Sequence, residues 1–216
     1  PILVEGLAVY LSGGHYKPEP LILRAVALPD LGDYIPLREL AQDFYKHQHE
    51  IGYLEAGALV QYLVETYGWD AFIAFYRDIH PALSGLQSDA LDLALQTHFG
   101  LTLDQLEADF LELLESQPVD LSHIEDVRLS VQFYDTVRRY QQMFDPSAYF
   151  QTAWLADASV MRQKNITADY LRRPDGIFNH YLENLLVEAD AALRSGDFTT
   201  TAQKLKALNV MLDILE

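Results

Sequence analysis

Residues 1–14 read PILVEGLAVYLSGG, and Glu5 is the only charged side chain among them. An apolar run of this length that ends in two glycines predicts a helix over residues 2–12 with one or more faces against protein. Burying an unpaired carboxylate is unfavourable, and a helical Gly costs about 1 kcal/mol relative to Ala. Glu5 and Gly6 are therefore two unfavourable neighbours in an otherwise favourable helix, a combination that is typical of functional positions.

The sequence leaves two interpretations of Glu5 open. In one, Glu5 faces solvent on a short helix or forms an ion pair with Arg24 or Arg38. In the other, it is buried and must be protonated, paired or bound to a metal ion. Gly6 beside it would let another segment approach the helix closely.

The remaining sequence favours an all-α fold, because apolar residues recur at helical spacing and convincing strand alternation is missing. A capping-box pattern at Thr102 and Gln105 predicts a helix start, and Ser122 with Glu125 predicts another. The polar loop SQPVDLS separates two expected parts, residues 1–118 and residues 119–216. Further helices are expected near 18–28, 36–45, 53–68, 69–80 and 88–100 in the first part.

The second part is expected to continue as helices to the last residue. A helix that runs to about Met143 is followed by one that starts at Asp145, and Thr167 caps a short helical piece. The final two helices form a predicted hairpin joined at residues 195–197.

Composition excludes several kinds of chemistry. The 216 residues contain no Cys, so disulfides, thiolate zinc sites and cysteine nucleophiles are excluded. The net charge is −17, and the first 116 residues hold 18 acidic against 5 basic side chains. Such acidity opposes nucleic-acid binding, and no basic patch with interleaved aromatics is present. No apolar run approaches the length of a membrane span.

Three segments resemble parts of the gluzincin, or peptidase MA-like, zinc metallopeptidases. Residues 2–8, ILVEGLA, are similar to the family's Trp-Leu-x-Glu-Gly-x-Ala helix with the aromatic residue replaced. Residues 53–75, YLEAGALVQYLVETYGWDAFIAF, resemble a family helix that carries a functional Tyr. Residues 94–110, ALQTHFGLTLDQLEADF, are similar to its closing segment. The resemblance implies that residues 1–118 are the C-terminal helical part of a metallopeptidase-like domain, followed by a helical bundle or hairpin region.

The resemblance also implies roles for two residues. Glu5 would be the third ligand of a catalytic zinc ion, and Tyr53 would donate a hydrogen bond to the tetrahedral intermediate. Tyr34 and Tyr45 are alternative candidates for the second role. We expect Glu5 and Tyr53 to line one cleft, where the zinc ion would polarise a peptide carbonyl and activate a water molecule.

The family's His-Glu-x-x-His helix is not found in these residues. His49 and Glu50 come closest, but Tyr53 stands where the second His would be, and His47 and His49 face different sides of a helix. The expectation is that this chain begins between the halves of an active site, binds no zinc by itself and is inactive.

A different class of function competes with the metallopeptidase hypothesis. Residues 119–216 would then be a non-catalytic α-helical interaction or scaffold module with an apolar docking patch. Expected partners are a peptide or protein substrate for the peptidase, and a second copy of the chain, as a homodimer, for exposed apolar surface. The resemblance favours an extracytoplasmic or secreted bacterial location.

Overall fold

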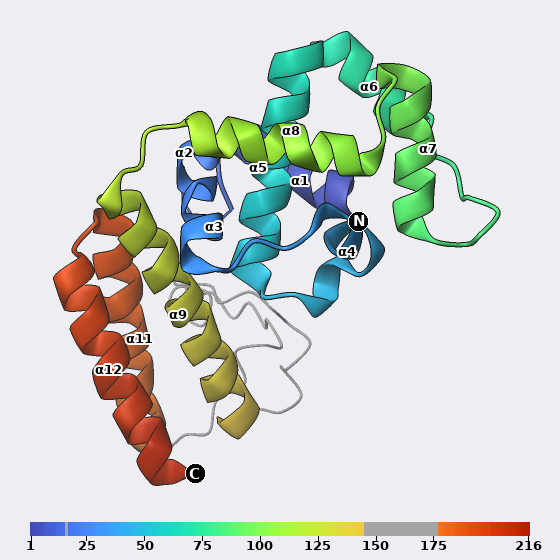
Figure 1. The fold of residues 1–216 in the computed structure, drawn as a ribbon. Helices are drawn as coiled ribbons and strands as arrows, with labels where there is room; N and C mark the ends of the chain where they lie inside the picture. The colour runs from blue at the N-terminus through green and yellow to red at the C-terminus, as the bar shows by residue number, and fades with distance from the viewer. Residues whose placement is uncertain (16, 145–176) are drawn as a thin grey trace. The chain divides into compact units, whose positions relative to one another are not determined.

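The computed structural model describes residues 1–15, 17–144 and 177–216, and helices are the only regular elements in these ranges. The all-α prediction is confirmed. Internal contacts divide the chain into two units, Pro1–Val127 and Arg128–Glu216, and each is described by itself (Figure 1). The helix expected from Asp145 and the cap expected at Thr167 lie outside the described residues.

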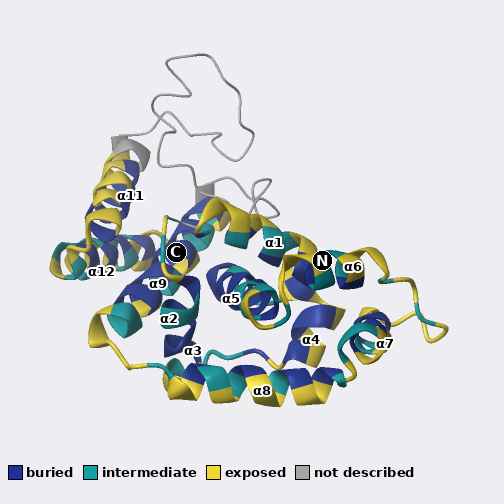
Figure 2. Cartoon of the chain, turned by 90° about the horizontal axis from the view of Figure 1, so that it is seen from above, coloured by how far each residue is buried: buried dark blue, intermediate teal, exposed yellow. Residues whose placement is uncertain are grey.

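Unit 1 is built around one long helix, α5 (His49–Tyr67), which is almost entirely buried in its first three turns (Figure 2). Its other elements are short or peripheral. They are α1 (Ile2–Ser12), α2 (Leu21–Ala25), α3 (Ala27–Leu31), α4 (Leu37–Gln42), η1 (Phe44–Lys46), α6 (Trp69–Arg77), α7 (Gln87–Phe99), α8 (Leu103–Ser116) and the start of α9 (Leu121–Phe144). Of these, α1 and α2 make the most extensive contacts with α5.

The crossing of α1 and α5 explains why Gly6 interrupts the apolar helix. A Cβ atom on Gly6 would lie 2.4 Å from the carbonyl oxygen of Ala56, closer than two such atoms can approach. Gly57 plays the reciprocal part on α5, since its Cβ would lie 2.6 Å from a methyl group of Val9. The segment that approaches Gly6 is therefore the backbone of α5. Glu5 is the neighbour of Gly6 on α1, so it lies beside this helix crossing.

Two helix starts differ from the sequence-based expectation. Helix α5 begins at His49, four residues before the expected start at Tyr53, because the Gln48 side chain accepts a hydrogen bond from the Ile51 amide at 2.8 Å. Helix α9 begins after Asp120, which accepts from the Ser122 amide at 2.8 Å, so Ser122 is not its cap. The capping box at the start of α8 is confirmed.

The division between the units falls within α9 rather than in the loop before it, where the sequence placed it at 118/119. Asp126, in the second turn of α9, forms ion pairs with Lys17 and Arg24 of unit 1. These contacts attach the first turns of α9 to unit 1.

Unit 2 comprises α9 from Arg128 onward, α11 (Ile177–Ser195) and α12 (Phe198–Leu215). The predicted hairpin is confirmed: α11 and α12 pack together, Gly196 takes a positive φ of 77°, and Asp197 caps α12. Arg139 of α9 bonds Asp213 and Glu216. Within the described ranges, no helix has the length and hydrophobicity that crossing a bilayer requires.

Candidate functional site

Glu5 lies against two tyrosines that come from separate elements. The Tyr45 hydroxyl, next to the short η1 turn, donates to Glu5 Oε1 at 2.6 Å. The phenol of Tyr53, on the second turn of α5, lies close enough to Glu5 that burial and the negative charge of that carboxylate together raise its pKa. Tyr45 is 63% exposed, whereas Glu5 and Tyr53 are half-buried. We call Glu5, Tyr45 and Tyr53 the Glu5 site.

The Glu5 site keeps both phenols in their protonated form. Burial and the negative charge of Glu5 raise the pKa of Tyr53 well above that of a free tyrosine. The hydrogen bond to Glu5, followed by burial, raises the pKa of Tyr45. Both residues are therefore hydrogen-bond donors at neutral pH, and they orient the carboxylate.

The alternative partners expected for Glu5 are engaged elsewhere. Arg24 contacts Glu19, Glu50 and Asp126, and Arg38 binds Asp104 at 2.9 Å. The expected pairing of Glu5 with either arginine is therefore wrong. The third tyrosine candidate is also remote, because the Tyr34 hydroxyl donates to Glu107 at 3.2 Å.

Aromatic rings from three segments surround Tyr53. The His15 ring stacks on it with centroids 4.2 Å apart and an interplanar angle of 21°. His49 lies at 4.5 Å, and Phe44 meets Tyr53 edge to face at 5.1 Å. These contacts fix the Tyr53 ring while its hydroxyl faces Glu5.

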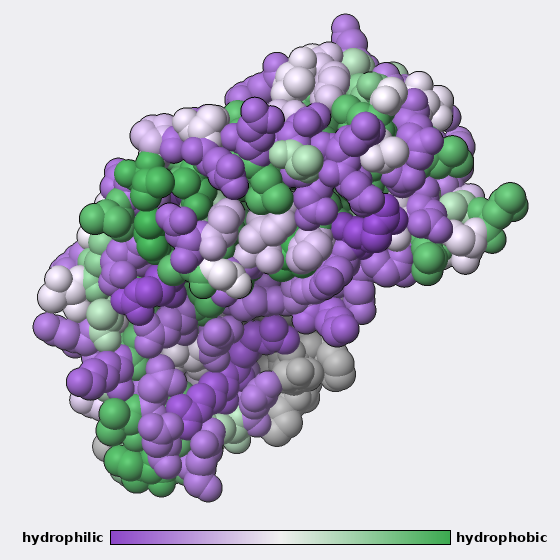
Figure 3. Space-filling model, viewed as in Figure 1, coloured by the Kyte–Doolittle hydropathy of each residue, from purple (hydrophilic) through white to green (hydrophobic). Residues whose placement is uncertain are grey.

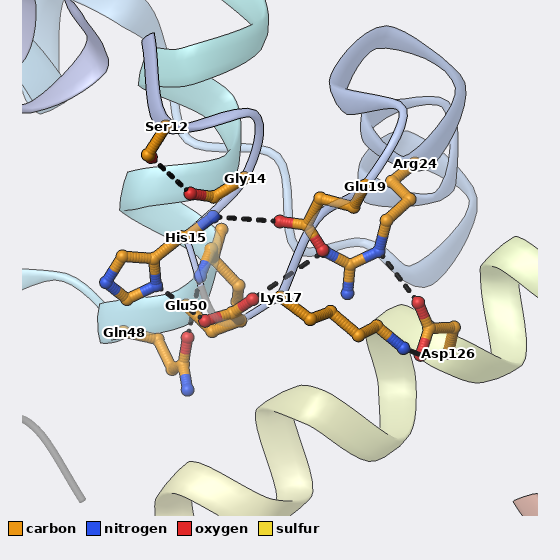
Figure 4. A network of polar contacts seen from close by, with 10 residues as sticks. Ser12, Gly14, His15, Lys17, Glu19, Arg24, Gln48, Glu50 and Asp126 are labelled. Carbon is orange, nitrogen blue, oxygen red and sulfur yellow. Dashed lines mark hydrogen bonds and ion pairs between the residues drawn. The ribbon is translucent and has the colours of Figure 1, made fainter. Parts of the chain in front are cut away.

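A second group of polar side chains lies behind His15. We call it the Arg24 cluster, and Figure 4 shows its members drawn from the loop after α1, from α2, from α5 and from α9. Arg24 is 1% exposed and binds Glu19 directly, while its Nε lies 2.9 Å from Asp126 Oδ2. The full cluster comprises His15, Lys17, Glu19, Arg24, Glu50 and Asp126.

The cluster contains three carboxylates against two permanent cations, Arg24 and Lys17. Burial raises the pKa of Glu19 to about 7 against the opposing effect of Arg24, so a proton on Glu19 can offset the excess negative charge near neutral pH. Burial would also raise the pKa of Glu50, but the hydrogen bond and charge of His15, together with Arg24, hold it below its ordinary value. Glu50 is therefore ionised, and His15 Nδ1 donates to its Oε2 at 2.9 Å.

Sequence reasoning missed the Arg24 cluster. The helices expected near residues 36–45 and 53–68 left His49 and Glu50 between them, although Glu50 is fully buried in the first turn of α5. One signal was present: the only arginine in the first 37 residues stands in an apolar helix, LILRA. A lone Arg there needs a buried acidic partner, although the sequence does not say which one.

The Glu5 site fits one position of a metal site. A carboxylate held by phenol donors resembles a zinc ligand with its supporting hydrogen bonds. Among the residues that the structure describes, however, no three His, Asp or Glu side chains gather so that they could hold a metal ion. With the described residues alone, Glu5 would therefore be a single ligand without the two further ones that a zinc site needs.

An apolar cavity of about 420 Å³ lies at the N-terminal end of α1, next to the turn that carries Glu5, although neither Glu5 nor Tyr53 lines it. Its walls are mostly apolar side chains from the start of α1, from α7 and from the loop before α7, together with Tyr76 of α6 and His80.

No protein-family model, no curated protein and no solved structure matches this chain. Any function must therefore be argued from the residues and their contacts.

Proposed function

We propose that the Glu5 site is part of a zinc-dependent peptidase centre, with Glu5 as one metal ligand. The observation that supports this proposal is the pairing of Glu5 with two protonated phenols, one of them Tyr53, at the surface of a close helix crossing. Glu5 is a carboxylate on an apolar helix, and it could accept a contact beyond the hydrogen bond from Tyr45. These properties are more typical of a metal ligand than of a residue in a structural ion pair.

In this proposal the other ligands are two histidines that lie outside these residues. The bound zinc ion would activate water and polarise the peptide carbonyl. This chain's own residues would orient the site: Tyr45 holds the Glu5 carboxylate, and Tyr53 beside it is the donor assigned to the developing oxyanion. Loss of one such donor typically costs about 2.7–4 kcal/mol of transition-state stabilisation.

The test uses the natural gene product that carries these residues, assayed with unstructured protein and peptide substrates. Glu5→Gln should abolish metal-dependent hydrolysis, and Tyr53→Phe should lower kcat by about 10²–10³ with a smaller change in KM. Glu65→Gln is the matched control, since Glu65 is exposed on α5 and accepts a hydrogen bond from Gln61 at 2.8 Å. Full hydrolysis by the Glu5→Gln protein would refute the proposal.

A non-catalytic interaction module remains the second candidate because unit 2 exposes apolar side chains. Phe178 and Tyr181 of α11 are 58% and 54% exposed. Val210 and Ile214 of α12 are also exposed, and Figure 3 shows hydrophobic atoms where this helix ends. A partner that binds wild-type chain but not a Phe178→Ser, Ile214→Ser double variant would favour this candidate, whereas the Glu5→Gln variant should bind it normally.

A further inference from the structure

His15 connects the two polar groups described above. One face of its ring stacks on Tyr53, whose phenol is close enough to Glu5 to interact with the charge of that carboxylate. Its Nδ1 donates to Glu50, a carboxylate with no exposed surface. Glu50 and Tyr53 are three residues apart on α5, so they share a helix face and His15 can contact both.

The His15 ring is held from its backbone as well. The His15 amide donates to Glu19 Oε1 at 3.2 Å, and Glu19 in turn binds the buried Arg24 (Figure 4). The loop that carries His15 is thus tied to α2 and α5 by buried charged groups. An imidazole with these anchors has one ring orientation, which is the condition for it to fix a neighbouring ring.

We propose that His15 is a positioning residue: Glu50 anchors its imidazole, and the imidazole holds Tyr53 with its hydroxyl against Glu5. The relevance of this arrangement to catalysis rests on the proposed function, but the arrangement itself is a property of this chain. Because His15 acts through Tyr53, it does not itself touch the metal ligand or the substrate.

The physical consequence can be measured on Tyr53 alone. The stacked imidazole covers one face of the Tyr53 ring, with ring centroids 4.2 Å apart. Removing the imidazole admits water to that face and frees the ring to turn away from Glu5. Both changes alter the chemical shift of the Tyr53 ring.

The experiment follows the ¹³Cζ resonance of Tyr53 by NMR in the full chain labelled at tyrosine, with Tyr53→Phe providing the assignment. His15→Ala should shift the Tyr53 resonance away from its wild-type position at neutral pH, because the imidazole stacked on the ring is lost. Glu5→Gln should also shift it, which shows that the resonance reports on Glu5. His80→Ala is the matched control, because the His80 side chain is 75% exposed, and it should leave the resonance unchanged.

His15→Phe separates positioning from simple packing. Phe refills the space and restores the ring stack, but it cannot bond Glu50. We expect this variant to unfold at a lower urea concentration than the wild type, because the buried Glu50 loses its His15 hydrogen bond, and its Tyr53 resonance to remain shifted although the ring stack is restored. A wild-type Tyr53 resonance in either His15→Ala or His15→Phe would overturn the inference.

These readouts need neither metal nor substrate. An inactive or zinc-free natural protein would therefore refute the proposed function and leave the role of His15 standing. Conversely, an unmoved Tyr53 resonance would refute the role of His15 without bearing on whether Glu5 binds zinc.

Discussion

Replacing Gly6 by Ala tests the helix crossing that carries Glu5. The new methyl group would lie 2.4 Å from the Ala56 carbonyl oxygen and 2.9 Å from a methyl group of Val60. The nearer atom belongs to the backbone of α5, which cannot rotate aside as a side chain can. We therefore expect Gly6→Ala to push α1 away from α5 and to weaken unit 1.

The magnitude follows from two opposing effects. Ala is better than Gly within a helix by about 1 kcal/mol, whereas overpacking a filled contact costs about 1–3 kcal/mol. Contact with backbone places this site at the upper end of that range, so the expected net loss of unfolding free energy is about 1–2 kcal/mol. Gly52→Ala is the matched control, because its methyl group would meet its nearest neighbour, in Leu40, at 3.6 Å. That change should stabilise the chain by about 0.5–1 kcal/mol.

The assay is urea unfolding followed by Trp69 fluorescence, with Trp154→Phe in every protein so that Trp69 is the single indole. Trp69 is a suitable probe because its ring lies 6.4 Å from Tyr10 of α1. The two variants should move the urea midpoint in opposite directions. A Gly6→Ala chain as stable as the Gly52→Ala chain would refute the close crossing.

Two further predictions concern the Arg24 cluster. Arg24→Ala should lower the unfolding free energy by about 3–5 kcal/mol because it leaves buried carboxylates unpaired, whereas the exposed Arg38→Ala should cost about 1 kcal/mol or less in the same urea assay. The pKa of Glu19 is raised to about 7 on folding. At pH values between the pKa of Glu19 in the unfolded chain and about 7, folding therefore takes up a proton. The free energy of unfolding should fall as the pH rises through this window. The contribution of Glu19 to this slope should reach at most about 1.4 kcal/mol per pH unit, so the slope should be shallower by up to that amount in Glu19→Gln; an unchanged slope in that variant would contradict the assignment.

Local signals allowed much of the fold to be predicted from the sequence. The run of residues 2–12, the Thr102 capping box and the turn at Gly196 each depend on residues a few positions apart. The start of α5 was misjudged because Gln48 is not among the favoured capping residues. A side chain that caps a helix by tertiary placement leaves little trace in a single sequence.

The candidate site, like the fold, could be predicted from the sequence only in part. The sequence marked Glu5 as anomalous, and the charge of Glu5 acts on the phenol of Tyr53, while the shared cleft and the chemical roles of both residues remain predictions. The Arg24 cluster could not be predicted because it joins Lys17 to Asp126, which is 109 residues further along the chain. Acidic residues are numerous here, so composition alone could not select the three that are buried with Arg24.

The central claim is that Glu5 binds zinc, and anomalous X-ray scattering at the zinc edge from crystals of the natural gene product tests it most directly. The account predicts one anomalous peak about 2.0–2.2 Å from a Glu5 carboxylate oxygen, absent in Glu5→Gln and retained in Tyr53→Phe. A zinc peak elsewhere, or a peak that survives in Glu5→Gln crystals, would contradict it.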